Sequence, residues 1–187
     1  MVKKKTCIFI SGQGTNLKNI IYRTRDENFP IKISLVICNN KNARGINYAK
    51  LYNIPLLIID TKKRNYENKI LIALKKNKIS FVCLAGYMKI VSEKIINNFK
   101  NKIINIHPSL LPKFKGLNTF KRIINENEMK TGCTVHYVSK KLDDGKIIIK
   151  KSFYLNVKDD ELSVKKKTQL LEHRAYPEAI IKIFRYC

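Results

Sequence analysis

The sequence has 187 residues, of which 44% are hydrophobic and 28% charged, and these proportions suit a single globular domain. Its 38 Lys and Arg residues outnumber 14 Asp and Glu residues, which gives a formal net charge of +24. No apolar run approaches the roughly 20 residues that a membrane-spanning helix needs, and the apolar run at residues 6–11 is too short for a secretory signal. We therefore expect a soluble cytoplasmic protein without a membrane partner.

The excess of basic residues favours anionic partners, nucleic acids among them. The lysines are spread along the whole sequence, and Ile and Asn are also abundant, a joint bias that AT-rich coding would produce without selection for charge. A basic surface would equally concentrate phosphorylated small molecules. The charge alone therefore leaves two functions open: a nucleic-acid-binding module and an enzyme that acts on anionic substrates.

The sequence contains five cysteines, an odd number, and no two of them have CxxC spacing. Cys7, Cys38 and Cys83 lie inside apolar runs. This pattern predicts buried, reduced thiols rather than disulfides or a zinc site.

Short apolar runs alternate with helix-like segments in the first half of the sequence. The predicted strands are residues 6–10, 31–38, 56–59, 80–84 and 103–107. The predicted helices between them are residues 16–25, 43–52, 66–77 and 92–99. Such alternation is typical of βαβ units, so we predict an α/β fold: a doubly wound, mostly parallel sheet flanked by helices.

The pattern changes after Pro112. A helix is predicted at residues 118–127, and two strands at residues 132–138 and 146–154 form an antiparallel extension of the sheet. A long final helix is predicted at residues 161–186. The sequence contains no internal repeat and no linker, so we predict a single domain over residues 1–187.

A glycine-containing loop follows the first strand. Gly12 and Gly14 allow a sharp turn, and Thr15 or Asn16 would cap the next helix. Backbone amides at a helix N-terminus can bind a phosphate, although a plain tight turn is the alternative. Leu17 occupies the place of the third glycine of the dinucleotide-binding fingerprint, so NAD is not expected.

The stretch NIHPSLLP (residues 105–112) follows the fifth strand, and ligands of open α/β sheets bind at the carboxyl ends of strands. Asn105 and His107 are two residues apart on an extended segment, so their side chains point the same way while Ile106 faces the core. An amide donor beside an imidazole suits acyl transfer, because both can stabilise an oxyanion or move a proton. The alternative is a histidine that only hydrogen-bonds the backbone. The later stretch LDDG (residues 142–145) reads by itself as a turn.

Six stretches together resemble the glycinamide ribonucleotide formyltransferases: ISGQGTNL (10–17), LAGYMKI (84–90), NIHPSLLP (105–112), TGCTVHYV (131–138), LDDG (142–145) and LEHRAYPEAI (171–180). NIHPSLLP is shared across the formyltransferase superfamily, whereas the glycine loop and the last stretch are specific to this branch. The resemblance implies transfer of a formyl group from 10-formyltetrahydrofolate, a cosubstrate, to the amine of glycinamide ribonucleotide in de novo purine biosynthesis. It implies no metal and no specific nucleic acid, and a monomer or homodimer.

The resemblance also assigns roles to residues. It implies a catalytic triad of Asn105, His107 and Asp143. Substrate-binding roles fall on Gly14, Thr15, Asn16 and Glu172, the first three toward the phosphate and the last toward the ribose. Folate-binding roles fall on Met88, Lys89, Ile90, Val91 and Asp143. Residues 1–100 would then form the phosphate- and substrate-binding half of the domain, and residues 101–187 the catalytic and folate-binding half.

In this reading the substrate amine attacks the formyl carbon, and Asn105 and protonated His107 stabilise the oxyanion. Asp143 would keep His107 charged by raising its pKa. Three residues depart from the family pattern: Asn118 replaces a usual histidine, Lys89 replaces an arginine, and Asp144 replaces a small residue. A second carboxylate at position 144 would raise the pKa of its neighbour.

Two other formyltransferase-like enzymes are rivals. A methionyl-tRNA formyltransferase shares the NIHPSLLP-type loop and suits the basic charge, but we expect it to carry a further C-terminal domain and a different first loop. A formyltetrahydrofolate hydrolase would carry an extra N-terminal domain, whereas the first strand here is predicted to begin by Thr6.

Overall fold

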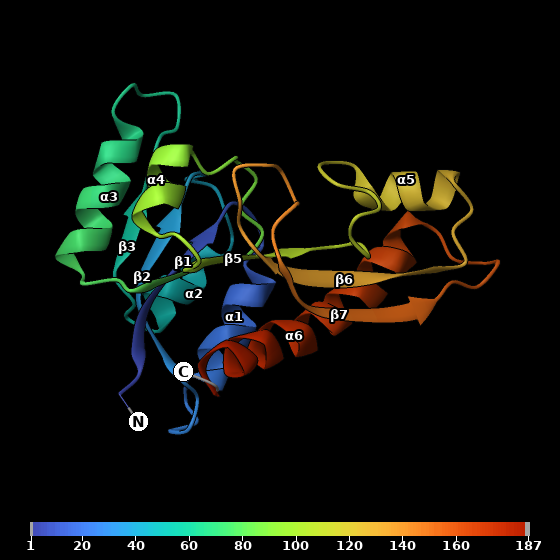
Figure 1. The fold of residues 1–187 in the computed structure, drawn as a ribbon, viewed down its shortest axis with the longest axis horizontal. Helices are drawn as coiled ribbons and strands as arrows, with labels where there is room; N and C mark the ends of the chain where they lie inside the picture. Colours follow the sequence, from blue (N-terminus) through green and yellow to red (C-terminus); the bar gives the residue numbers. More distant parts are fainter. Residues whose placement is uncertain (1, 186–187) are drawn as a thin grey trace. The chain divides into compact units, whose positions relative to one another are not determined.

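The computed structural model describes residues 2–185, whose helices and strands are labelled in Figure 1. The chain forms two compact units that divide between Ile104 and Asn105. In the described part of the chain, no helix is both long and apolar enough to cross a lipid bilayer.

Parallel strands form the sheet of the first unit. They are β1 (Lys4–Ile10), β2 (Ile31–Cys38), β3 (Leu56–Ile58) and β4 (Phe81–Leu84), in the order β3-β2-β1-β4. Strand β5 (Ile103–His107) begins beside β4, where the Val82 amide donates to the Lys102 carbonyl at 2.8 Å. The strands are apolar because helices cover both faces of a parallel sheet, and residues 7–10 of β1 are at most 1% exposed.

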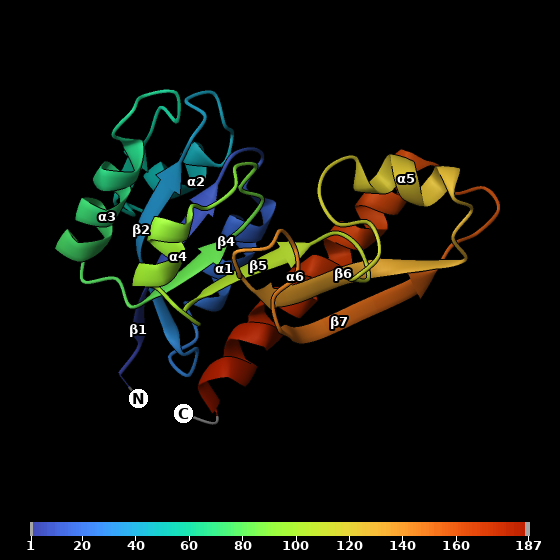
Figure 2. The same ribbon diagram turned by 45° about the horizontal axis from the view of Figure 1, so that its top comes forward.

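The four helices of this unit are α1 (Thr15–Arg23), α2 (Ile46–Leu51), α3 (Tyr66–Lys76) and α4 (Glu93–Asn98). The chain winds outward from β1 to β3 and then reverses to β4 and β5. Because crossover connections between parallel strands are right-handed, this reversal places α1 and α2 on one face of the sheet and α3 and α4 on the other, as Figures 1 and 2 show. The doubly wound α/β prediction is confirmed, and the switch point between β1 and β4 marks the edge where ligands of such folds bind.

The second unit continues from the end of β5. Strands β6 (Lys130–Tyr137) and β7 (Ile147–Tyr154) pair antiparallel, as predicted, and α6 (Glu161–Arg185) packs across both of them and contacts α5 (Thr119–Asn125). The start of α6 is fixed by reciprocal capping, because the Ser163 amide donates to Asp160 Oδ1 at 2.7 Å and the Asp160 amide donates to Ser163 Oγ at 3.0 Å.

Most predicted element ends are within two residues of the observed ones, and the helix predicted at 43–52 is the main exception. It begins only at Ile46, because the segment before it is folded by the Asn40 side chain, whose Oδ1 accepts from the Asn42 amide at 3.0 Å. Asparagine side chains of this kind compete with helix formation. The last residue of the helix predicted at 161–186, Tyr186, lies outside the described residues.

The prediction of buried thiols is confirmed for the described residues. Four cysteines are buried and free: Cys7, Cys38, Cys83 and Cys133. Burial, followed by the nearby charge of Glu172, raises the pKa of Cys133 to about 12, which makes it an inert thiol at neutral pH. The fifth, Cys187, lies outside the described residues.

Candidate active site

The end of β5 brings two polar side chains to one place. Asn105 Nδ2 lies 3.4 Å from Asp143 Oδ1, and His107 Nδ1 lies 3.2 Å from Asp143 Oδ2. Ile106 between them is only 6% exposed. The strand alternation therefore works as predicted: the two polar side chains reach the same carboxylate, while the intervening isoleucine is buried in the core.

Asp143 reaches this place from the turn between β6 and β7, where it adopts a left-handed backbone conformation with φ 47°. It is only 9% exposed, and its Oδ2 also accepts from the Gly116 amide at 2.9 Å. Burial raises the pKa of Asp143, but hydrogen bonds from His136 and the Gly116 amide and the charges of the two imidazoles outweigh burial. The net pKa of Asp143 lies below its ordinary value, so the carboxylate is charged at neutral pH.

His107 is 4% exposed, and acceptors flank both of its ring nitrogens. Nδ1 faces Asp143, and Nε2 lies 2.8 Å from the Phe114 carbonyl oxygen. Only a doubly protonated imidazolium can donate to both at once. Burial nevertheless lowers the pKa of His107, and Asp143 and the Phe114 carbonyl, which raise it, offset burial only in part. Asp143 therefore raises the pKa of His107 as expected, but desolvation is the larger effect and leaves the net pKa below its ordinary value.

Asp144 does not act on Asp143 in the predicted way. Its carboxylate points to Lys115 and pairs with Lys115 Nζ, and both side chains are partly exposed. This lysine lowers the pKa of Asp144. Asp144 does not contribute to the pKa of Asp143, which is lowered rather than raised, so the prediction of a carboxylate–carboxylate effect is wrong.

His136 of β6 is a fourth member of this cluster. It is 2% exposed, its Nε2 lies 3.3 Å from Asn105 Nδ2, and its Nδ1 lies 2.9 Å from the Tyr137 carbonyl oxygen. Its Nε2 also lies 3.6 Å from Asp143 Oδ1, so the ring lies against both the amide and the carboxylate of the cluster. Two sequence signals pointed to its place here: its position on a predicted strand and its occurrence in TGCTVHYV (131–138), one of the stretches that carry the family resemblance.

The glycine loop lies in the first unit, at the carboxyl end of β1. Gly14 is the residue before α1 and has φ 71°, and a Cβ added there would lie 2.5 Å from Gly45 Cα, so only glycine fits. No side chain caps α1 at this position. The prediction that Thr15 or Asn16 caps the helix is wrong, because both residues already lie in its first turn.

Ser11 joins this loop to the segment predicted to bind folate. Its Oγ accepts from the Met88 amide at 2.8 Å, and its amide donates to the Gly86 carbonyl at 3.1 Å. Within the segment, Met88 is 64% exposed and Ile90 is 74% exposed, whereas Val91 is 7% exposed. Exposed apolar side chains next to a glycine loop suit a ligand rim, and Val91 packs in the core.

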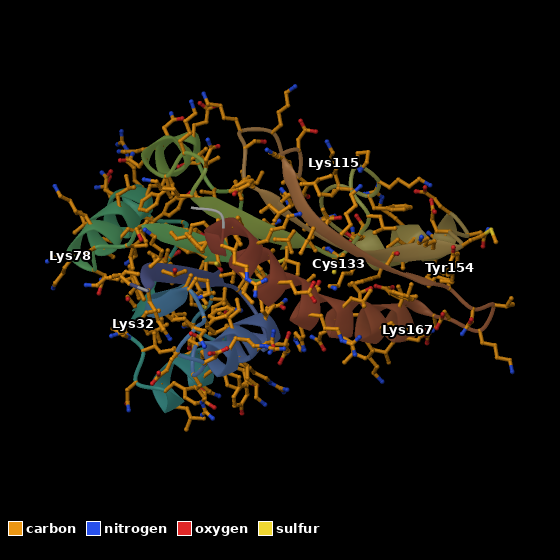
Figure 3. All side chains as sticks on the ribbon, turned by 60° about the horizontal axis from the view of Figure 1, so that its bottom comes forward. Lys32, Lys78, Lys115, Cys133, Tyr154 and Lys167 are labelled. Carbon is orange, nitrogen blue, oxygen red and sulfur yellow. The ribbon has the colours of Figure 1, made fainter. Side chains whose placement is uncertain are left out.

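The remaining predicted site residues are Lys89, which is exposed, and Glu172, which is half-buried on α6. The positive charge occurs on different elements of each unit, as the labelled lysines in Figure 3 illustrate. Lys32 lies on β2 and Lys78 follows α3 in the first unit, while Lys115 and Lys167 lie in the turn before α5 and on α6 in the second. A spread of this kind differs from the clustered basic face of a dedicated nucleic-acid-binding module.

An α/β fold with an amide, an imidazole and a carboxylate at the end of a strand suits an acyl-transferring enzyme. Residues 4–180 match the family described as Formyl transferase, and the chain therefore belongs to the formyl transferase family. It is 37% identical over 187 residues to phosphoribosylglycinamide formyltransferase of Haemophilus influenzae, which covers 97% of this chain and 87% of that protein. The protein of the same name from Bacillus subtilis is 33% identical over 183 residues, covering 95% and 93%.

A solved structure of phosphoribosylglycinamide formyltransferase from Bacillus halodurans superposes with a TM-score of 0.92 at 36% identity, covering 96% of this chain and 95% of that one. The chain is also 35% identical over 182 residues to the trifunctional purine biosynthetic protein adenosine-3 of Gallus gallus, but it spans only 18% of that protein's length. The resemblance drawn from the sequence is thus confirmed at the level of the family and its glycinamide ribonucleotide branch.

Proposed function

We propose that this chain transfers the formyl group of 10-formyltetrahydrofolate to the amine of glycinamide ribonucleotide, a step of purine biosynthesis. The observation that carries the proposal is the convergence of Asn105, His107 and Asp143 in a chain that matches proteins named phosphoribosylglycinamide formyltransferase over nearly its whole length. The family supplies the reaction class, and the cluster supplies the groups that the reaction needs.

The chemistry uses Asn105 as a donor to the oxyanion and protonated His107 as a nearby positive charge, because both ring nitrogens of His107 already face acceptors. The substrate amine attacks the formyl carbon, and the carbonyl oxygen becomes the oxyanion of a tetrahedral intermediate. Asn105 Nδ2 has only long contacts, 3.3 Å to His136 and 3.4 Å to Asp143, so an oxyanion is a stronger acceptor that can take over one of its protons. Losing one donor of this kind typically costs about 10²–10³-fold in turnover.

His107 and Asp143 together manage the proton. Burial lowers the pKa of His107, but negative charge developing on the substrate oxygen favours the imidazolium. The ring therefore takes up a proton from solvent as the intermediate forms and returns it to solvent as the intermediate collapses. Asp143, charged at neutral pH, accepts the proton released by the attacking amine, directly or through a water. That proton then passes to the folate nitrogen as its bond to the formyl carbon breaks, which yields the formylated ribonucleotide and tetrahydrofolate.

Substrate recognition divides over the predicted binding residues. The phosphate binds at the start of α1, at the backbone of Gly14, Thr15 and Asn16. Only glycine fits at position 14, because the loop backbone packs there against Gly45, and this constraint on the loop supports the role. Glu172 contacts the ribose. Met88, Lys89 and Ile90 form the folate rim, and buried Val91 supports it from beneath.

The reaction needs no metal, and the enzyme works in the cytoplasm as a monomer or homodimer without specific nucleic acid.

A steady-state assay tests the proposal. The chain is incubated with 10-formyltetrahydrofolate and either glycinamide ribonucleotide or charged initiator methionyl-tRNA, which addresses the rival that the net charge of +24 suggests. We expect tetrahydrofolate to form only with the ribonucleotide; formation only with tRNA would refute the proposal.

A further inference from the structure

The turn of residues 114–116 contacts both members of the imidazole–carboxylate pair through its backbone. The Phe114 carbonyl accepts from His107 Nε2 at 2.8 Å, and the Gly116 amide donates to Asp143 Oδ2 at 2.9 Å. Because these contacts come from the backbone, the conformation of the turn fixes the orientation of both side chains.

This turn adopts an unfavourable conformation. Phe114 has φ 59° and Gly116 has φ 82°, and a positive φ is strained for a bulky side chain such as that of Phe114. Such a conformation persists only where neighbouring groups hold it. The groups that hold the turn therefore also control the site.

Arg122 of α5 contacts two consecutive residues of the turn. Its Nη1 donates to the Lys115 carbonyl at 2.9 Å, and its guanidinium lies over the Phe114 ring at 5.3 Å from the ring centre. The ring is only 7% exposed, so the stack lies against a packed side chain. A planar guanidinium can stack and donate at the same time, which a lysine ammonium cannot do.

We propose that Arg122 is a positioning residue for His107 and Asp143: it holds the 114–116 turn, and the turn holds the two side chains. This inference rests on the proposed function, because it assigns Arg122 a part in formyl transfer. The two hydrogen bonds to His107 and Asp143 come from Phe114 and Gly116, not from Arg122. The effect of Arg122 therefore passes through the backbone of the turn.

Two further contacts hold the same turn, and both are weaker. Lys115 pairs with Asp144, but both side chains are more than a third exposed, and exposed ion pairs contribute little to stability. Thr119 Oγ1 donates to the Gly116 carbonyl at a long 3.2 Å. Arg122 alone among these three contacts the residue with the strained φ.

Arg122 also acts on His107 through its charge. The groups that face this imidazole are Asp143 and the Phe114 carbonyl, which raise its pKa, and His136 and Arg122, which lower it. Replacing Arg122 should therefore loosen the turn and remove a positive charge. Substitutions that loosen the turn without removing the charge, or remove the charge while keeping a donor, can separate these two effects.

The test compares three variants with one matched control. Arg122→Lys keeps the charge without the planar stack, Arg122→Gln keeps a donor without the charge, and Arg122→Ala removes both. Lys121→Ala, next to it on α5 and exposed, is the control. For each, kcat and both KM values are measured, NMR follows the titration of His107 and the solvent exchange of the Gly116 amide, and circular dichroism checks the fold.

We expect Arg122→Ala to lower kcat roughly 10–100-fold with both KM values within about threefold of wild type, as for a misplacement of catalytic groups. The Gly116 amide should exchange faster, and the pKa of His107 should rise in Arg122→Ala and Arg122→Gln but not in Arg122→Lys. If Arg122→Ala does not fold, the Lys and Gln variants carry the same comparison. Wild-type kcat, amide exchange and His107 titration in the variants would overturn the inference. If wild type transfers no formyl group, the proposed function fails, and the NMR measurements still decide the positioning role.

Discussion

Replacing Asp143 by Asn removes the charge beside His107 while keeping the shape of the side chain. The carboxylate lies 3.2 Å from His107 Nδ1, and unit charges at this distance interact by about 5 kcal/mol at an effective dielectric constant of about 20, which is a ceiling. Opposite charges at such distances typically shift a pKa by about 1–3 units, or about 1.4–4 kcal/mol. We therefore expect the pKa of His107 to fall by about 1–3 units and kcat to fall roughly 10²–10³-fold.

The assay is steady-state formyl transfer over a range of pH, together with NMR titration of His107. The activity that remains should increase as the pH falls, because the imidazolium is then restored. Asp144→Asn is the matched control, since this neighbouring carboxylate pairs with Lys115 instead, and we expect its kcat within about threefold of wild type. Equal losses in both variants, or an unmoved His107 titration in Asp143→Asn, would contradict a role of the Asp143 charge in the reaction.

Three further predictions follow from the same contacts. The lowered pKa of Asp143 means that its charge stabilises the fold above the unfolded-state pKa of about 3.9 and that this contribution is lost as the pH falls through the folded pKa. The Tm difference between wild type and Asp143→Asn should therefore be largest at neutral pH and shrink as the pH falls below the unfolded-state pKa. Gly14→Ala, whose new Cβ would lie 2.5 Å from Gly45 Cα, should destabilise the fold by about 1–3 kcal/mol and raise the KM for glycinamide ribonucleotide more than the KM for the folate, as thermal melts and kinetics would check. In a Cys187→Ser background, a thiol reagent should label native protein negligibly and four sites after unfolding; fast labelling of native protein would contradict the burial of Cys7, Cys38, Cys83 and Cys133.

The strands were predictable because a buried parallel strand is a continuous apolar run. The predicted bounds of β2 and β5 match the observed Ile31–Cys38 and Ile103–His107. Helix ends were less predictable, since local side-chain hydrogen bonds decide them, as Asn40 does before α2.

The site was predictable where it depends on local geometry. Strand alternation was enough to put Asn105 and His107 together. The approach of Asp143 to His107 depends on the path of β6 and β7, so only the family resemblance could assign it a role. The effect of Asp143 on the pKa of His107 was predicted, but the larger opposing effect of burial was not, because the extent of burial around a strand end cannot be read from neighbouring residues in the sequence.

The most direct test of the account is single-turnover formyl transfer with isotopically labelled 10-formyltetrahydrofolate, in which mass spectrometry follows the label into glycinamide ribonucleotide. Wild type, Asn105→Ala, His107→Ala and Asp143→Asn are compared at saturating concentrations of both substrates. The account predicts rapid transfer by wild type and a loss of roughly 10²-fold or more in each variant. Transfer at the wild-type rate by any of the three variants, or no label on the ribonucleotide with wild type, would contradict it.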